Sequence, residues 1–301
     1  MLALICGTGA LPAAVAAAQD IRPLICVLED FAPDDLEADA TFRIERLGSF
    51  LLDLGTRGIT DICLCGAITR PALNPAFLDN ETKPLVPVLM TAMAQGDDGA
   101  LRAVIQLFEQ TGFTIRSAEE LAPDILPGQG VLSTVHPTGQ TRADVEHALE
   151  AMAEMGQRDI GQSCIVRQGE VVALEGQDGT DAMLSAQAGC YEPPWYGRDP
   201  TEWLAGLRSD ALQSAANWFS RNDAPVEKTA KREGGILFKA PKPNQDRRAD
   251  LPTIGPKTAM AAAEAGLDGI VIEAGGVIVL DREQVLRVLD GLGMFLWVRA
   301  R

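Results

Sequence analysis

Charged and conformationally restricted residues are concentrated in residues 239–255, the charged segment, which directly follows the apolar run 235–238. Pro241, Pro243 and Pro252 fix their own φ and bias the residues before them toward extended backbone, so the charged side chains are predicted to project from a stiff, non-helical stretch. Ammonium and guanidinium groups neutralise phosphate oxygens, and a carboxylate can hold a divalent cation or orient water. This composition indicates a site that handles phosphates.

Asp250 is the first candidate for chemistry in the charged segment. It stands between Arg248 and Pro252, where neighbouring cations favour the ionised carboxylate and a proline disfavours a helix. Charge alone leaves an alternative open, namely a solvated basic loop whose acids merely balance its bases.

The pattern K-A-P-K-P-x-Q-x-x-R-x-D-L-P-T-I-G at 239–255 closely resembles the signature of the LpxI-type UDP-2,3-diacylglucosamine diphosphatases of lipid A biosynthesis. Further segments resemble that family in the same order, and together they span nearly the whole chain apart from one insertion. The resemblance implies hydrolysis of UDP-2,3-diacylglucosamine to 2,3-diacylglucosamine 1-phosphate (lipid X) and UMP. It also implies water attack on the α-phosphate and a divalent cation, Mg²⁺ or another, as cofactor.

For the charged segment, the resemblance implies direct roles in this reaction. Asp250 would bind the cation or serve as the base, while the cationic side chains would clamp phosphate oxygens. The substrate-binding candidates in this segment are Lys239, Lys242, Gln245, Arg248 and Thr253.

A glycine turn follows the first apolar run of the chain. Residues 1–6 read as a strand, Gly7-Thr8-Gly9 as a turn and residues 13–19 as a helix, a junction that lets backbone N–H groups approach a phosphate or ribose. A tight turn without a ligand is the alternative, because the third glycine of the dinucleotide fingerprint is missing. The family opens similarly, with three consecutive glycines, from which Thr8 departs. The substrate-binding candidates here are Gly7, Gly9, Ala10 and Leu11.

Arg70 follows a second predicted strand, residues 59–65. Ligands of open α/β sheets bind outside the carboxyl ends of the strands, so Arg70 is predicted to reach the same crevice as the glycine turn and to hold the UMP half of the substrate. As a lone arginine before a proline, it could equally cap a helix. The surrounding G-x-[VI]-x-R-P pattern resembles the family.

Three acids spaced three apart, Glu175, Asp178 and Asp181, accompany two glycines and Thr180 in a third stretch. This spacing fits either a capped helix start, with Thr180 or Asp181 as the cap, or an oxygen-rich site for a hard cation and phosphates. The resemblance favours the second reading. It implies that Gly179 and Thr180 contact the α-phosphate or sugar and that Glu175, Asp178 or Asp181 shares in binding the metal. Asp178 and Asp181 are the metal-ligand candidates beside Asp250.

The elements around these stretches predict two α/β domains. Strands and helices alternate in the first half, which indicates a Rossmann-like parallel sheet, and a hairpin with later strands indicates a mixed α/β second half. The predicted domains are residues 1–135, binding the UMP half, and residues 136–301, catalytic and lipid-sugar binding, with the active site between them. An insertion at about 190–232, rich in tryptophan, is either a lid over acyl chains or an ordinary surface insertion.

Composition restricts the setting and the partners. No apolar run approaches the roughly 18 residues of a membrane span, and the N-terminus lacks the features of a signal peptide, so a cytoplasmic location is predicted. A formal net charge of −16 disfavours nucleic acid and broad adhesion to anionic lipid, leaving a local, transient contact with the cytoplasmic face of the inner membrane. Six cysteines without a C-x-x-C pair are expected to be reduced and structural. A homodimer is left open.

Two other functions stay open from the sequence. One is a non-catalytic nucleotide-sugar or lipid-binding protein that has kept the same scaffold. The other, suggested by the opening glycines, is a dinucleotide-dependent oxidoreductase.

Overall fold

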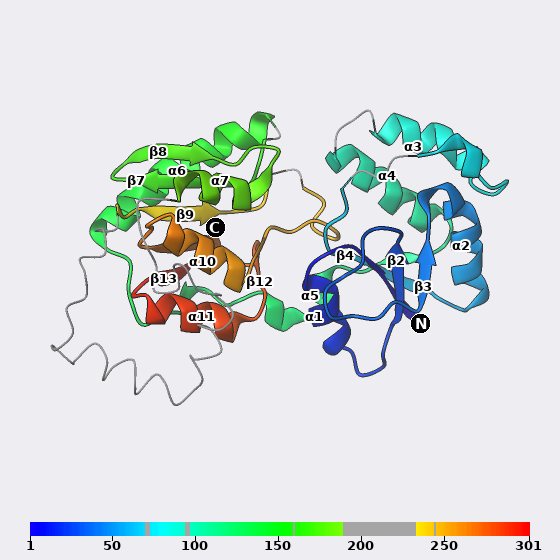
Figure 1. The fold of residues 1–301 in the computed structure, drawn as a ribbon, viewed down its shortest axis with the longest axis horizontal. Coiled ribbons are helices and arrows are strands. Elements are labelled where there is room, and N and C mark those ends of the chain that lie inside the picture. The colour runs from blue at the N-terminus through cyan, green and yellow to red at the C-terminus, as the bar shows by residue number, and fades with distance from the viewer. Residues whose placement is uncertain (70–72, 94–96, 159, 189–232, 244) are drawn as a thin grey trace. The chain divides into compact units, whose positions relative to one another are not determined.

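The computed structural model describes residues 1–69, 73–93, 97–158, 160–188, 233–243 and 245–301 (Figure 1). The chain forms two compact units: unit 1 comprises Met1–Ile125 and Gln245–Leu251, and unit 2 comprises Leu126–Asn244 and Pro252–Arg301. The domain division predicted from the sequence, 1–135 and 136–301, stays a prediction. The insertion at 190–232 lies outside the described residues.

Unit 1 is built on a parallel five-stranded sheet, as the alternating pattern predicts. The sheet has the order β3-β2-β1-β4-β5, in which every neighbouring pair is parallel. This is the order of Rossmann-like sheets, and it reverses direction between β1 and β4. The strands are β1 Leu2–Cys6, β2 Leu24–Leu28, β3 Ala40–Phe42, β4 Asp61–Cys65 and β5 Thr114–Ile115.

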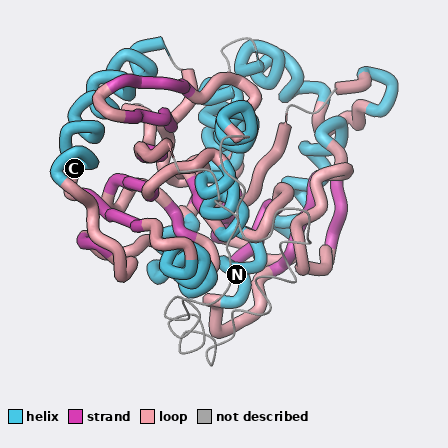
Figure 2. The backbone as a smooth tube through the Cα atoms, turned by 60° about the vertical axis from the view of Figure 1, so that its left-hand side comes forward, coloured by secondary structure: helices cyan, strands magenta, loops and turns pink. Residues whose placement is uncertain are grey.

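Helices cover this sheet because their apolar residues recur at helical spacing. Leu51 and Leu54 of α2, with Ile105 and Phe108 of α4, are buried in one core with strand residues such as Ile62. The alternation of strand and helix can be followed in Figure 2. The helices are α1 Leu11–Ala17, α2 Leu47–Thr56, α3 Val86–Met93, α4 Asp97–Gln110 and α5 Ala118–Leu121, with short 3₁₀ turns η1 Ile44–Arg46, η2 Pro75–Phe77, η3 Lys83–Leu85 and η4 Pro123–Ile125.

Unit 2 contains a mixed six-stranded sheet of order β6-β13-β11-β9-β7-β8. Its β9, β11 and β13 are parallel, whereas β6 and β7 join them antiparallel and β7–β8 forms the predicted hairpin. A separate parallel pair joins β10 and β12. The strands are β6 Gly130–Val131, β7 Ser163–Arg167, β8 Glu170–Leu174, β9 Ile236–Lys239, β10 Thr253–Ile254, β11 Gly269–Glu273, β12 Ile278–Val279 and β13 Phe295–Arg299.

The two faces of this sheet carry different helices. Helix α6 (Gly139–Arg158) shares a core with Phe238, whereas α7 (Gly179–Gln187), α10 (Pro256–Glu264) and α11 (Arg282–Gly291) share a core with Leu237. Successive strand residues point to opposite faces, so the last residue of β9, Lys239, falls on the α7 face. No helix in the described ranges is long and apolar enough to span a bilayer.

The cysteines that the structure describes are buried and unpaired: Cys6, Cys26, Cys63, Cys65 and Cys164. Burial raises the pKa of Cys26 and of Cys164 to about 12, so both thiols stay protonated at neutral pH. This agrees with the expectation of reduced, structural thiols. Cys190 lies outside the described residues.

Candidate active site

The loops that follow β1 and β4 meet at the point where the strand order reverses. A Cβ on Gly7 would lie 2.4 Å from the Ala67 carbonyl oxygen, and a Cβ on Gly66 would lie 2.6 Å from the Gly7 oxygen. Thr8 and Ala67 exchange two backbone hydrogen bonds of 2.9 Å, and the Gly7 N–H donates to Cys65 O at 2.8 Å. Gly7 therefore allows the two loops to approach each other closely.

These bonds limit which part of the glycine turn can meet a ligand. The N–H group of Gly7 already donates to Cys65 at the end of β4, and that of Thr8 donates to Ala67 in the following loop. Gly9, at a φ of 93°, leads through Ala10 into α1, which begins at Leu11, and the first N–H groups of a helix have no acceptor within it. Gly9, Ala10 and Leu11 are thus the ligand-facing candidates, while Arg70 lies outside the described residues.

The start of the charged segment is fixed in unit 2 by prolines that lie against glycines. A Cβ on Gly276 would lie 2.8 Å from Cδ of Pro241, and a Cβ on Gly156 of α6 would lie 2.7 Å from Cδ of Pro243. Side chains at these glycines would collide with the proline rings. The segment leaves β9 along a defined path, and Lys242, between the two prolines, is half-buried.

Lys239 belongs to a buried chain of polar side chains that links β9, α7 and β7. Its Nζ donates to Thr180 Oγ1 at 2.7 Å, and Thr180 Oγ1 lies 3.3 Å from Ser163 Oγ. Ser163 Oγ donates to Glu175 Oε2 at 2.7 Å. The sequence singled out Lys239, Thr180 and Glu175 but missed Ser163, whose only signal is a hydroxyl at the head of an apolar strand.

The acids before and inside the first turn of α7 take other positions. Asp178 is the N-cap residue of α7, but its side chain makes no capping bond, and the Thr180 hydroxyl is engaged with Lys239. The alternative of a helix capped by Thr180 or Asp181 is therefore wrong, because both residues lie inside α7. Gly179 has a φ of 82°, and Asp178 and Asp181 are exposed beside the helix N-terminus.

The part of the charged segment that belongs to unit 1 is held by an ion-pair network. Arg248 donates to both carboxylate oxygens of Asp246, at 3.0 and 2.7 Å, and to Glu109 Oε1 of α4 at 2.6 Å. Hydrogen bonds from the Arg248 guanidinium hold the pKa of Asp246 below its ordinary value. The guanidinium predicted to clamp phosphate therefore pairs with two carboxylates of unit 1.

Asp250 is held at the end of the same turn. Its N–H donates to Asp246 O at 3.1 Å, and the Gln245 side-chain amide donates to its Oδ2. Ala249, directly before it, packs against the core of unit 1. Thr253 instead belongs to unit 2, where it pairs with Ile278 across β10 and β12.

The predicted metal ligands do not form a cluster of their own. Within the described ranges no three His, Cys, Asp or Glu side chains are grouped closely enough to hold a metal ion. Mg²⁺ is commonly held by one or two carboxylates together with substrate phosphate oxygens and water. The carboxylates of Asp250, Asp178 and Asp181 fit that donor chemistry.

Comparisons with known proteins cover nearly the whole chain. The family model described as the LpxI N-terminal domain matches residues 1–125, and the LpxI C-terminal domain matches residues 128–201 and 210–297. A protein of Caulobacter vibrioides (strain ATCC 19089 / CIP 103742 / CB 15), named UDP-2,3-diacylglucosamine pyrophosphatase LpxI, is 36% identical over 299 residues, which cover 98% of this chain and 95% of that protein. The chain therefore belongs to the LpxI family.

Proposed function

We propose that this chain hydrolyses UDP-2,3-diacylglucosamine to 2,3-diacylglucosamine 1-phosphate and UMP in lipid A biosynthesis. The observation that carries the proposal is the 36% identity, over 98% of the chain, with a relative whose name states that activity. The buried Lys239–Thr180 contact on α7 supports it, because a cation held beside a helix N-terminus suits a phosphate group.

In the proposed reaction, water attacks the α-phosphorus and its oxygen forms the new P–O bond of UMP. The bond from the α-phosphorus to the bridging oxygen breaks and releases 2,3-diacylglucosamine 1-phosphate. Asp250 accepts the proton of the water or holds the divalent cation, and Lys239 and Lys242 neutralise phosphate oxygens. The carboxylates of Asp250, Asp178 and Asp181 are the candidates that would hold a divalent cation such as Mg²⁺, which would supply positive charge against the diphosphate when bound.

The binding roles follow the local geometry. Gly9, Ala10 and Leu11 offer backbone N–H groups to the nucleotide half, and Gly179 and Thr180 receive the lipid-sugar half. Because the guanidinium of Arg248 pairs with Asp246 and Glu109, we assign Arg248 to holding the charged segment rather than to the phosphates.

The acyl chains of this substrate set its location. A diacylated sugar nucleotide resides in a bilayer, so the proposal includes transient contact of a cytoplasmic protein with the inner-membrane surface. A flotation assay with vesicles that contain the substrate lipid tests this part separately.

Product analysis in ¹⁸O-labelled water tests the reaction. The purified protein is incubated with UDP-2,3-diacylglucosamine in detergent micelles, with Mg²⁺ or with EDTA, and the products are identified by mass spectrometry. UMP carrying one ¹⁸O, formed with Mg²⁺ and lost with EDTA, is the expected result.

Three other results would contradict parts of the proposal. If ¹⁸O is found in the sugar phosphate, water attacks the β-phosphorus. If activity is full in EDTA, the reaction needs no divalent cation. If the protein binds the substrate but releases no UMP, it is a nucleotide-sugar-binding protein and not an enzyme.

A further inference from the structure

Two residues of opposite charge are buried in unit 2 and are joined by a chain of polar side chains. Lys239 is 6% exposed and Glu175 is 7% exposed, while Ser163 between them is fully buried. Burying a charge is costly unless hydrogen bonds and opposite charge compensate it. Here two hydroxyl groups carry the connection from the ammonium to the carboxylate.

The protons available on these side chains fix the direction of each hydrogen bond in the polar chain. The Glu175 carboxylate only accepts, so the single proton of Ser163 Oγ is donated to it, at 2.7 Å. Ser163 Oγ must then accept from Thr180 Oγ1, which lies 3.3 Å away. Thr180 Oγ1, having donated its own proton, presents lone pairs to the Lys239 ammonium at 2.7 Å.

The carboxylate end of the chain is fixed by backbone. Glu175 N donates to Ser163 O at 3.0 Å, and Gln162 N donates to Glu175 Oε2 at the same distance. Gly161, at a φ of 54°, allows close packing here, because a Cβ on it would lie 2.3 Å from the Glu175 carbonyl oxygen. Glu175 is therefore a fixed acceptor, and it determines which of the two hydroxyl groups donates to the other.

We infer that Ser163 and Glu175 are positioning residues for the hydrolysis, acting through Thr180 to hold the Lys239 ammonium at the end of β9. The inference rests on the proposed function, in which Lys239 neutralises a phosphate oxygen. Without the carboxylate acceptor, Ser163 Oγ is able to donate to Thr180 Oγ1, and the Thr180 hydroxyl that accepts from Lys239 is no longer oriented by donating to Ser163. Removal of Ser163 Oγ breaks the chain outright.

Single substitutions with matched controls test this inference. Ser163→Ala removes the middle hydroxyl of the polar chain, and Glu175→Gln replaces the acceptor-only carboxylate at its end with an uncharged amide that can also donate. The controls, Ser133→Ala and Asp144→Asn, alter a buried hydroxyl and a buried carboxylate of the same unit that serve other partners: Ser133 Oγ bonds Val135 O and Leu296 N, and Asp144 Oδ1 bonds Gln140 and Gly169 N.

We expect Ser163→Ala and Glu175→Gln to lower kcat/KM about 10- to 100-fold, the size of effect that a slightly displaced group has on catalysis. The two controls should keep kcat/KM within about 2-fold of wild type while lowering Tm to a similar extent, because they lose comparable buried hydrogen bonds. Ser163→Thr keeps the hydroxyl and should recover most of the activity.

A double-mutant cycle with Lys239→Met separates positioning from general loss of structure. If Ser163 acts through Lys239, Ser163→Ala lowers kcat/KM by less than about 2-fold in the Lys239→Met background. If Ser163 had only a structural role, the losses in kcat/KM caused by Ser163→Ala and Lys239→Met would multiply in the double mutant.

The outcomes distinguish this inference from the proposed function. If the wild-type protein is active and the folded Ser163→Ala and Glu175→Gln variants are fully active, only the positioning role is overturned. The same follows if the losses in kcat/KM multiply in the double mutant. If wild type and both controls release no UMP, the proposed function itself fails, and the positioning role fails with it.

Discussion

Lys239 and Asp250 belong to one charged segment, yet different parts of the molecule hold them. Lys239 ends β9 in unit 2 and is anchored through hydroxyls of β7 and α7. Asp250 ends a turn of unit 1, where a backbone bond to Asp246 and the Gln245 amide orient it. The proposed charge neutralisation and the proposed proton or cation chemistry are therefore open to separate tests.

At the residue scale, Asp250→Ala is expected to abolish UMP release, by at least about 100-fold in kcat, because the group that takes the proton or holds the cation is lost. The circular dichroism spectrum should not change, since Asp250 lies in a turn. Asp20→Ala, which removes an exposed acid of the same unit, is the control and should retain full activity. A folded Asp250→Ala protein of undiminished rate would remove Asp250 from the mechanism.

At the element scale, periodicity predicted the strands and helices well, because local patterning decides them. The parallel sheet of unit 1 and the β7–β8 hairpin both follow from short sequence patterns. The side-chain partners of Thr180 and Arg248 could not be predicted in this way. Thr180 meets Lys239 and Arg248 meets Glu109 across long sequence separations, and composition carries no sign of such pairings.

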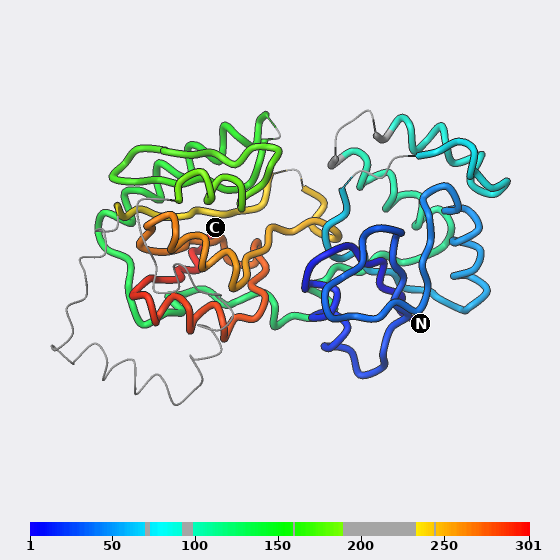
Figure 3. The backbone as a smooth tube through the Cα atoms, in the orientation of Figure 1, coloured from blue at the N-terminus to red at the C-terminus, as the bar shows by residue number. Residues whose placement is uncertain are grey.

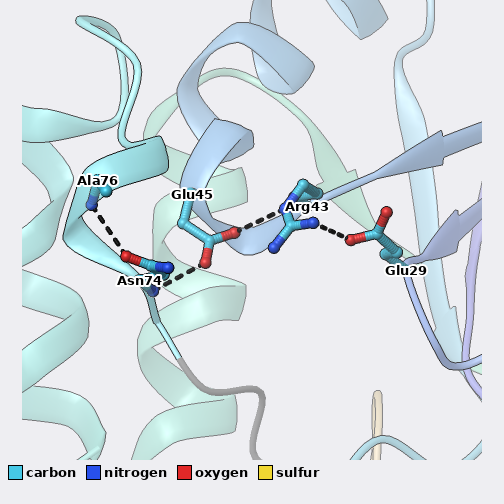
Figure 4. Close-up of polar contacts among 5 residues, drawn as sticks. All are labelled: Glu29, Arg43, Glu45, Asn74 and Ala76. Carbon is cyan, nitrogen blue, oxygen red and sulfur yellow. Dashed lines mark hydrogen bonds and ion pairs between the residues drawn. The ribbon is translucent and has the colours of Figure 1, made fainter.

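A second polar network, in unit 1, joins two short elements that no motif predicted (Figure 4). Glu45 of η1, only 1% exposed, accepts from Asn74 N at 2.8 Å and from Arg43 Nε at 3.3 Å, and Arg43 also pairs with Glu29. Asn74 in turn accepts from Ala76 N at the start of η2. Burial opposes ionisation of Glu45, but hydrogen bonds from Asn74 N, its own N–H and Arg43 outweigh it and hold the pKa of Glu45 below its ordinary value.

Glu45→Gln should therefore lower the free energy of unfolding by about 1.5–3 kcal/mol at pH 7, the usual contribution of hydrogen bonds to a charged group. The lowered pKa means that the contribution of the carboxylate is complete above the pKa of the unfolded chain and is lost as pH falls through that of the folded protein. The gap between wild type and variant should shrink from pH 6 to pH 3. Urea unfolding at several pH values measures it, and exposed Glu81→Gln is the control. A gap independent of pH would contradict this role.

At the scale of the whole molecule, the chain passes between the two units more than once. Residues 245–251 belong to unit 1, although β9 before them and β10 after them belong to unit 2, and the trace can be followed in Figure 3. A short segment that belongs to a different unit from its sequence neighbours needs its own contacts with that unit, which serve as anchors. Here the anchors are Ala249 in the core of unit 1 and the ion pairs of Arg248.

Glu109→Gln tests whether the ion pair to α4 keeps this segment in place. Both side chains of the pair are about two-fifths exposed, 42% and 41%, so the pair is worth about 0.2–1 kcal/mol. The amides of Ala249 and Asp250, which donate to Asp246 O, should exchange with deuterium faster. The value of kcat/KM should fall about 1.4- to 5-fold, which is the same free energy expressed as a rate. Glu120→Gln is the control, because Glu120 faces Arg116 instead.

Salt separates the electrostatic anchor from packing. In 0.5 M NaCl, where the Debye length is roughly 4 Å, wild type should exchange nearly as fast in residues 245–251 as Glu109→Gln does, and the variant should change little. Exchange that is slow in both proteins at every salt concentration would mean that Ala249 and the bidentate Asp246–Arg248 pair suffice. In that case the position of Asp250 depends on the turn itself and not on α4.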